Sequence, residues 1–239
     1  TAIASRGGNV ELIVVYATGD NQNPSSIYNS YTGVQWACEN GANVVSMSYG
    51  SENSSNAMQD LIYAYPEVVF IAAAGNDSSS TQNYPAAYQN VIGVGSVDSN
   101  DLRSSFSNYN VGFPWVDIAA PGGYSYGGLL STVYTESLNG YARFGGTSMA
   151  TPFAAGLVGL MLSVNPSLTP IQIQNCLVNS GVDINQNIGP RIDAYQALLC
   201  VQPENDNPIP AFTASPQVTF ENQSVIFSNN SVNGTNWVW

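Results

Sequence analysis

An α/β fold with a mostly parallel sheet is the fold class that this 239-residue sequence predicts. Short runs of β-branched and small apolar residues alternate along the chain with amphipathic segments of helical length. The runs are apolar at nearly every position, as in strands that are covered on both faces. Gly41 and Pro66 each stand where a helical segment ends and the next apolar run follows. Such an alternation is typical of a parallel sheet between two layers of helices.

The predicted elements follow one another in that alternation. Strands are expected where Val, Ile and Ala cluster, at residues 10–16, 43–48, 68–74 and 91–97. Helices are expected at residues 26–40, 55–65, 148–164, 170–179 and 193–200. Thr169, Pro170 and Gln172 have the order of a capping box with proline at the first helical position. The polar stretch 99–144 is expected to be irregular and to hold a short hairpin.

The composition favours a soluble extracellular protein with a substantial core. Hydrophobic residues make up 44% of the chain, and sixteen acidic against four basic residues give a net charge of −12. Because so few basic residues are present, no patch of them can neutralise a phosphate backbone. No uninterrupted apolar run approaches the roughly 20 residues of a bilayer span. We therefore expect a secreted protein that binds neither nucleic acid nor membrane, and we expect it to be a monomer.

Three parts are expected along the chain. Residues 1–201 form the main domain, residues 202–210 a linker rich in proline and polar residues, and residues 211–239 the start of a β-sandwich. The sequence begins without Met, and its alternating pattern breaks off at Trp239, so both ends look cut. The piece of sandwich is too short to bury a core by itself.

The three cysteines do not decide whether the chain contains a disulfide. An odd number in a secreted chain suggests one disulfide and one thiol. A bridge between Cys176 and Cys200 would close a loop near the end of the main domain, and three free thiols are the alternative to it. The connectivity does not follow from the sequence.

The segment 145–152, Gly-Gly-Thr-Ser-Met-Ala-Thr-Pro, carries the strongest chemical signal. Its glycines permit a close approach of backbone or substrate, and the start of a helix favours developing negative charge. Ser148 is therefore a candidate nucleophile, with a helix N-cap as the structural alternative. A serine hydroxyl needs an adjacent base to become nucleophilic, and the chain contains neither histidine nor lysine.

A second candidate, Asn76, follows the apolar run Ala72-Ala73-Ala74-Gly75. A side-chain amide that projects from the end of a strand can donate to an oxyanion, and an ordinary turn asparagine is the alternative.

Taken together, these segments resemble the subtilisin-like serine proteases, the subtilase family, over about residues 1–200. The resemblance implies a three-layer fold, an acyl-enzyme on Ser148, an oxyanion donor in Asn76 and extended polypeptides as substrates. The segment 45–50 resembles the family's substrate-binding strand. The residues that would form the walls of the specificity pocket are Ser48, Tyr49, Gly50, Ala73, Ala74 and Gly75. Tyr49 suggests a pocket for apolar side chains.

The resemblance extends to cofactors and to the second domain. It implies that the chemistry requires no cofactor and that structural calcium is compatible with the many oxygen ligands, although no contiguous ligand loop is visible. No metal ligands are predicted. From about Pro208 the chain resembles the start of a PKD-type domain, a β-sandwich often attached to secreted hydrolases.

The chain departs from the family in one respect, since it lacks the family's catalytic histidine. The opening residues resemble the stretch directly after the family's histidine segment, so we expect the catalytic Asp and His to lie upstream of residue 1. These 239 residues alone are then expected to be inactive. Asp20, Asp77, Asp98 and Asp117 lie in the wrong segments to be the triad aspartate.

Three alternatives remain. The chain could be a catalytically dead pseudoprotease that binds peptides. It could be a sedolisin-type Ser-Glu-Asp peptidase, although that branch has aspartate where Asn76 stands. It could also use Thr1 as an N-terminal nucleophile, with its own amine as base.

Overall fold

The computed structural model describes residues 10–17, 27, 29–124, 127–133, 140–202, 212–215 and 226–229. The chain divides into two compact units, Thr1–Val201 and Gln202–Trp239. In the second unit, strands β7 (Phe212–Ser215) and β8 (Ile226–Asn229) pair antiparallel. The rest of the predicted linker and sandwich lies outside the described residues, and the identity of the second domain stays a prediction.

A four-stranded parallel sheet forms the middle of the first unit. Its order is β1 (Val44–Met47), β2 (Val69–Ala73), β3 (Val91–Val97) and β4 (Ile118–Pro121). Every residue of β2 and β3 is buried, as their almost entirely apolar sequences predict. Strand β4 lies within the stretch that was expected to be irregular. Its four residues are too few to show a period, and it is defined by its pairing with β3.

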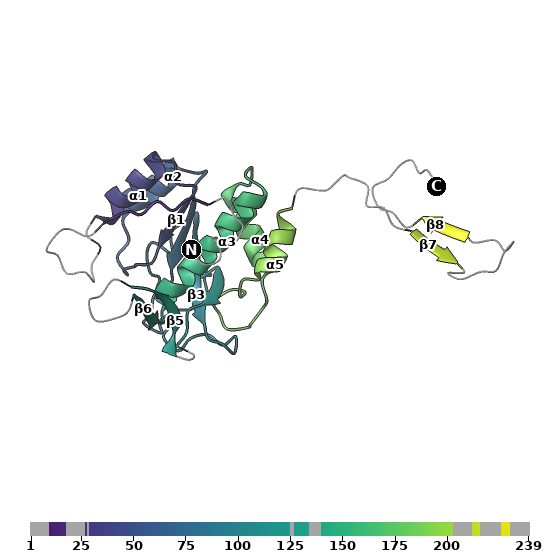
Figure 1. Ribbon diagram of the computed structural model, residues 1–239. Helices are drawn as coiled ribbons and strands as arrows, with labels where there is room; N and C mark the ends of the chain where they lie inside the picture. Colours follow the sequence, from purple (N-terminus) through teal and green to yellow (C-terminus); the bar gives the residue numbers. More distant parts are fainter. Residues whose placement is uncertain are drawn as a thin grey trace. The chain divides into compact units, whose positions relative to one another are not determined.

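Helices cover the sheet on both faces (Figure 1). Helices α1 (Ser30–Glu39) and α2 (Asn56–Ala64) contribute to one buried cluster with the residues of one sheet face. Helices α3 (Thr147–Val164), α4 (Pro170–Ser180) and α5 (Ala194–Cys200) contribute to a second cluster on the other face. The predicted three-layer α/β fold is thereby confirmed.

Helix α3 is the central helix of this arrangement. By length and composition it is apolar enough to cross a membrane. It packs, however, against all four strands of the sheet, and Ala150, Ala154 and Leu157 have no exposed surface. Its hydrophobicity therefore reflects its place in the core.

Helices α4 and α5 are stabilised by a capping box and a disulfide. Thr169 and Gln172 form the predicted capping box at the start of α4. Cys176 and Cys200 form a disulfide that ties α4 to α5, which selects the first of the two cysteine alternatives. Cys38 is a buried free thiol, and burial together with Glu67 raises its pKa to about 11.

Residues 10–16 were predicted to form a strand, but the described segment 10–17 has no strand assignment. They have no strand partner among the described residues, and the side chains of Leu12, Val14 and Tyr16 are at least 70% exposed. A β-branched run becomes a strand only where a neighbour accepts and donates its backbone hydrogen bonds. The composition of this segment therefore does not suffice to make it a paired strand.

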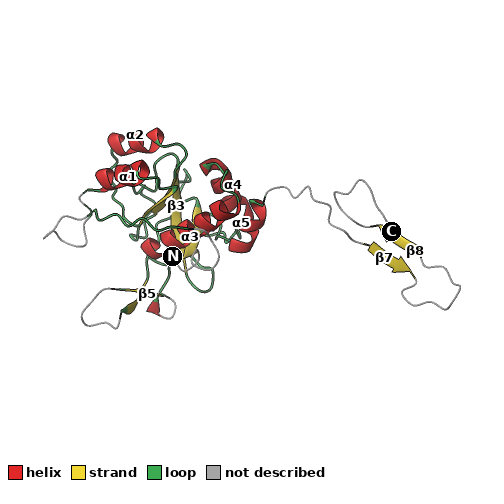
Figure 2. Cartoon of the chain, turned by 45° about the horizontal axis from the view of Figure 1, so that its top comes forward, coloured by secondary structure: helices red, strands yellow, loops and turns green. Residues whose placement is uncertain are grey.

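The expected hairpin is present and separate from the main sheet (Figure 2). Strands β5 (Leu129–Thr132) and β6 (Tyr141–Phe144) pair antiparallel.

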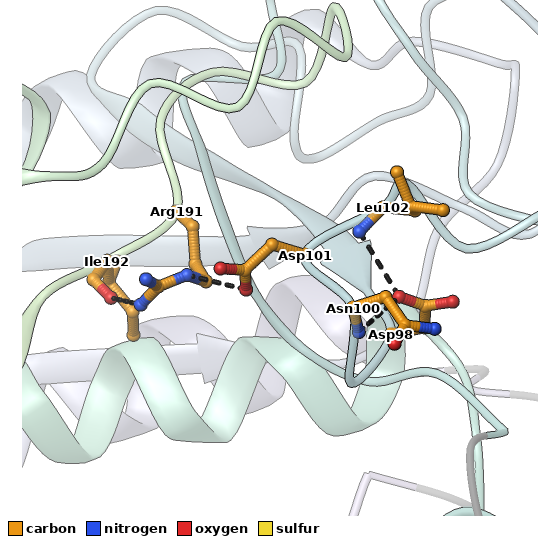
Figure 3. A network of polar contacts seen from close by, with 6 residues as sticks. All are labelled: Asp98, Asn100, Asp101, Leu102, Arg191 and Ile192. Atoms are coloured by element: carbon orange, nitrogen blue, oxygen red, sulfur yellow. Dashed lines mark hydrogen bonds and ion pairs between the residues drawn. The ribbon is translucent and has the colours of Figure 1, made fainter.

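On the main sheet, an ion pair joins the turn after β3 to the segment before α5 (Figure 3). There Asp101 and Arg191 form an ion pair of 2.7 Å between Oδ1 and Nε, without the alignment of a hydrogen bond.

Candidate active site

Ser148 lies in the first turn of α3, beyond the carboxyl ends of β1 and β2. The N-cap of this helix is Gly146, which has no side chain, so Ser148 does not have the capping role that was its structural alternative. The N–H of Gly146 donates to the carbonyl of Gly122, just after β4, at 2.7 Å. The start of α3 is thereby held against the sheet, and Ser148 is left half-buried at the surface.

Two reciprocal hydrogen bonds join Ser148 to Ser48. The Oγ of Ser48 donates to the carbonyl of Ser148 at 2.9 Å, and the Oγ of Ser148 donates to the carbonyl of Ser48 at 3.1 Å. Ser48 follows directly after β1. The candidate nucleophile is therefore fixed to the end of the strand that was expected to bind substrate, and its proton is held by a backbone oxygen.

The amide of Asn76 is oriented by Thr147. Its Oδ1 accepts from the N–H of Thr147 at 2.9 Å and from the hydroxyl of Thr147 at 3.0 Å. The same hydroxyl accepts from the N–H of Gly75 at 3.1 Å. Because the Thr147 N–H can only donate, the oxygen of the Asn76 amide must face it. The NH₂ group of Asn76 consequently faces away from Thr147.

Two donors are thus left without an acceptor near the start of α3. Among the described residues, neither the Nδ2 of Asn76 nor the backbone N–H of Ser148 has a hydrogen-bond partner. The first N–H groups of a helix have no partner within it, and they lie at its positive end. This pair of donors beside a serine hydroxyl is suited to stabilise an oxyanion.

The loop that carries Asn76 is held from beneath by two buried asparagines. The side chains of Asn83 and Asn108 both donate to the carbonyl of Ala74, at 3.3 and 3.0 Å. Asn108 also accepts through Oδ1 from the N–H of Asp77 at 2.9 Å. Gly75 has a φ of +103°, a conformation that favours glycine, and it lets the chain turn sharply into Asn76.

A pocket of about 340 Å³ opens beside Ser148 and Asn76. Six of the sequence-predicted residues line it, namely Ser148, Asn76, Tyr49, Gly50, Ala73 and Gly75. The other two do not. Ser48 instead bonds to Ser148, and Ala74 is fully buried with its carbonyl bound by the two asparagines. Burial raises the pKa of Tyr49 to about 12, so its phenol stays neutral.

Comparison with known proteins decides the family. The family model described as "Subtilase family" matches residues 3–205. The chain belongs to the subtilase family. This subtilase is 39% identical over 178 residues to the alkaline elastase YaB of Bacillus sp. (strain YaB), covering 74% of the chain and 44% of that relative. It is 37% identical over 194 residues to subtilisin DY of Bacillus licheniformis, covering 78% of the chain and 66% of that relative.

Solved structures show the same fold. Proteases from Pseudoalteromonas arctica PAMC 21717 match with a TM-score of 0.66 at 29% identity, over 72% of this chain and 58% of that chain. The prenylagaramide maturation protease PagA matches with a TM-score of 0.67 at 24% identity, over 77% of this chain and 71% of that chain. The subtilase chain thus spans less than two thirds of the length of both curated relatives.

Several residues of this subtilase site were not foreseen from the sequence. They orient Asn76, hold its loop or line the pocket, and they are Thr147, Asn83, Asn108, Glu52 and Asp77. Thr147 stands beside Ser148 in the motif, so its position was a usable signal. Asp77 and Glu52 likewise lie within two residues of predicted site residues, whereas Asn83 and Asn108 reach the site only through the fold.

The calcium that the family suggests is not located by any cluster of acidic side chains in the described part of the chain. Among the described residues, no group of three or more His, Cys, Asp or Glu side chains could hold a metal ion. We therefore assign no metal site and derive no step from one.

Proposed function

We propose that this subtilase is a secreted serine endopeptidase that hydrolyses extended polypeptides through an acyl-enzyme on Ser148. The supporting observation is that one pocket is lined by the Ser148 hydroxyl and by two donors, the Ser148 N–H and the Asn76 Nδ2, for which the described residues provide no acceptor. In the reaction, Ser148 Oγ attacks the scissile carbonyl while the two donors stabilise the oxyanion. The substrate backbone adds to the strand end at Ser48.

The base for this reaction must come from outside these residues. The 239 residues contain no histidine, and the Ser148 proton is held by the carbonyl of Ser48. A carbonyl oxygen is too weak a base to remove it. We infer that the catalytic His and Asp belong to a part of the protein beyond these 239 residues. This stretch of chain alone should give no measurable triad hydrolysis.

Composition and packing support the remaining parts of the proposal. The net charge of −12 disfavours nucleic acid as a partner, and the burial of α3 in the core accounts for its apolar sequence without a membrane. The Cys176–Cys200 disulfide suits an oxidising, extracellular compartment. We propose that the protein acts as a monomer and requires no cofactor for its chemistry.

Acylation by an activated ester in the presence of imidazole tests the proposal on the chain as it is. Imidazole accepts the Ser148 proton, the Oγ–acyl bond forms and p-nitrophenolate leaves from a peptidyl p-nitrophenyl ester. Mass spectrometry of a digest should place the acyl group on Ser148. Asn76→Ala should slow the reaction, and Ser148→Ala should abolish it. Ser163→Ala, whose hydroxyl bonds to Leu160 within the same helix, is the matched control.

The outcome separates the main proposal from its alternative. Acylation at another residue, or an unchanged rate in Ser148→Ala, would contradict the proposal. Peptide binding without acylation would favour the pseudoprotease instead.

A further inference from the structure

The described residues that line the pocket beside Ser148 include two acidic side chains. Glu52 lies on the wall that continues from Tyr49, and Asp77 follows Asn76 on the opposite wall. None of the described residues that line the pocket is Lys, Arg or His. Both carboxylates belong to exposed residues, so salt weakens their field without removing it at low ionic strength.

Asn83 closes the space between the two walls. The residue is only 7% exposed, and it lines the pocket. Its amide lies against Gly50 on one wall and Gly75 on the other. A Cβ added to Gly50 would overlap this amide, and one added to Gly75 would lie 2.8 Å from Nδ2. A side chain that enters between the walls therefore meets a polar group at the far end.

The polarity of that end is fixed by the hydrogen bond to Ala74. The Nδ2 of Asn83 donates to the Ala74 carbonyl, which can only accept, and Oδ1 is the atom that remains. Within the described part of the chain, no donor reaches this oxygen. Asn83 lines the pocket, so a ligand that brings an N–H group there can donate to this oxygen.

We propose that this pocket selects peptides with Lys or Arg on the amino side of the scissile bond. The inference rests on the proposed function, since it names the substrate class of the same site. A cationic end group donates to Asn83 Oδ1 and is attracted by Glu52 and Asp77, whereas an apolar side chain of equal length does neither. An acidic side chain is repelled. Tyr49 offers its ring to the aliphatic stem of the side chain.

Peptidyl boronic acids test this selectivity because they form a tetrahedral adduct with a serine hydroxyl without turnover. Three compounds share the same residues before the boron-bearing one, which is an analogue of lysine, norleucine or glutamate. Calorimetry should find the lysine compound about fivefold to tenfold tighter than norleucine at low salt, with glutamate weakest. The ratio of lysine to norleucine should shrink at high salt.

Substitutions test which side chains cause the preference for the lysine compound over the norleucine compound. The double substitution Glu52→Gln and Asp77→Asn should bring the ratio near one, and Asn83→Ala should reduce it and admit a phenylalanine analogue. Glu67→Gln removes an exposed carboxylate that does not line the pocket, and it should leave the ratio unchanged.

Failure of the specificity and failure of the function give different results. If norleucine or glutamate binds as tightly as lysine, while Ser148→Ala weakens the binding of every boronate, only the selectivity is overturned. An unchanged ratio in the double variant overturns it too. If no boronate binds, or if Ser148→Ala leaves the affinity unchanged, the proposed function falls together with the selectivity.

Discussion

Replacing Asp117 by Asn should stabilise the protein, and increasingly so as the pH rises. Asp117 directly precedes β4, where its carboxylate accepts from the N–H of Gly93 at 2.7 Å and from the amide of Gln174 at 3.3 Å. Burial outweighs these two bonds and raises the pKa of Asp117 from its ordinary value of 3.8 to about 6. The folded protein therefore holds this proton more tightly than the unfolded chain does.

The magnitude follows from that shift. One pKa unit corresponds to about 1.4 kcal/mol, so a rise of about two units corresponds to roughly 3 kcal/mol. Because the folded pKa is raised, this stability is fully present below about pH 4 and is lost as the pH rises through about 6. Between pH 5 and pH 8, the advantage of Asp117→Asn over the parent should grow by about 1.4 kcal/mol.

Urea unfolding at a series of pH values, followed by tryptophan fluorescence, measures this difference. Asp60→Asn, at an exposed carboxylate on α2, is the matched control, because the burial argument gives it no effect. Boronate affinity should not change in Asp117→Asn, because Asp117 lies at the opposite end of β4 from Gly122. A difference between variant and parent that stays constant or shrinks from pH 5 to pH 8 would refute the reasoning.

Three further substitutions are informative. Replacing both Cys176 and Cys200 by Ser opens a loop with a separation of 24 residues, which should lower the free energy of unfolding by about 3.5 kcal/mol; reduction of the parent protein should give the same loss. The hydroxyl of Tyr49 is buried without a partner among the described residues, so Tyr49→Phe should raise the free energy of unfolding by about 1 kcal/mol, and a loss in thermal melts would disprove this. Thr147→Val removes the hydroxyl that orients Asn76 and leaves the Gly75 N–H unpaired, so it should cost about 1–3 kcal/mol of stability and weaken boronate binding. Thr151→Val, which loses a bond to the Thr147 carbonyl within the same helix, should not weaken that binding.

The sequence predicted the fold wherever the signal was local. Strand β3 was placed at its observed bounds because its seven buried residues form a run of small and β-branched residues in which Ser96 is the only polar one. The helix starts at Ser55 and Thr169 were predictable from their capping side chains. Residues 10–16 show the limit, because their composition indicates extended chain but cannot say whether a partner strand lies beside them.

The residues of the candidate site likewise fall into those that the sequence predicted and those that it did not. Ser148 and Asn76 stand in motifs whose chemistry is legible from neighbouring residues. The role of Asn83 could not be predicted from the sequence. This asparagine closes the pocket only because the fold brings two glycines from separate strand ends against its amide. The reciprocal bonds between Ser48 and Ser148 join residues 100 positions apart, which no local pattern reveals.

The carbonyl of Ala74 couples the width of the pocket to the position of the loop that carries Asn76. It accepts from Asn83, which lines the pocket, and from Asn108, which also holds the loop that carries Asn76. A change that widens the pocket at Asn83 removes one of these two anchors and so disturbs Asn76, two residues beyond Ala74. The effect of a substitution at Asn83 on substrate preference should therefore depend on the residue at position 108. Protein variants selected for a new preference through position 83 should tend to change position 108 as well.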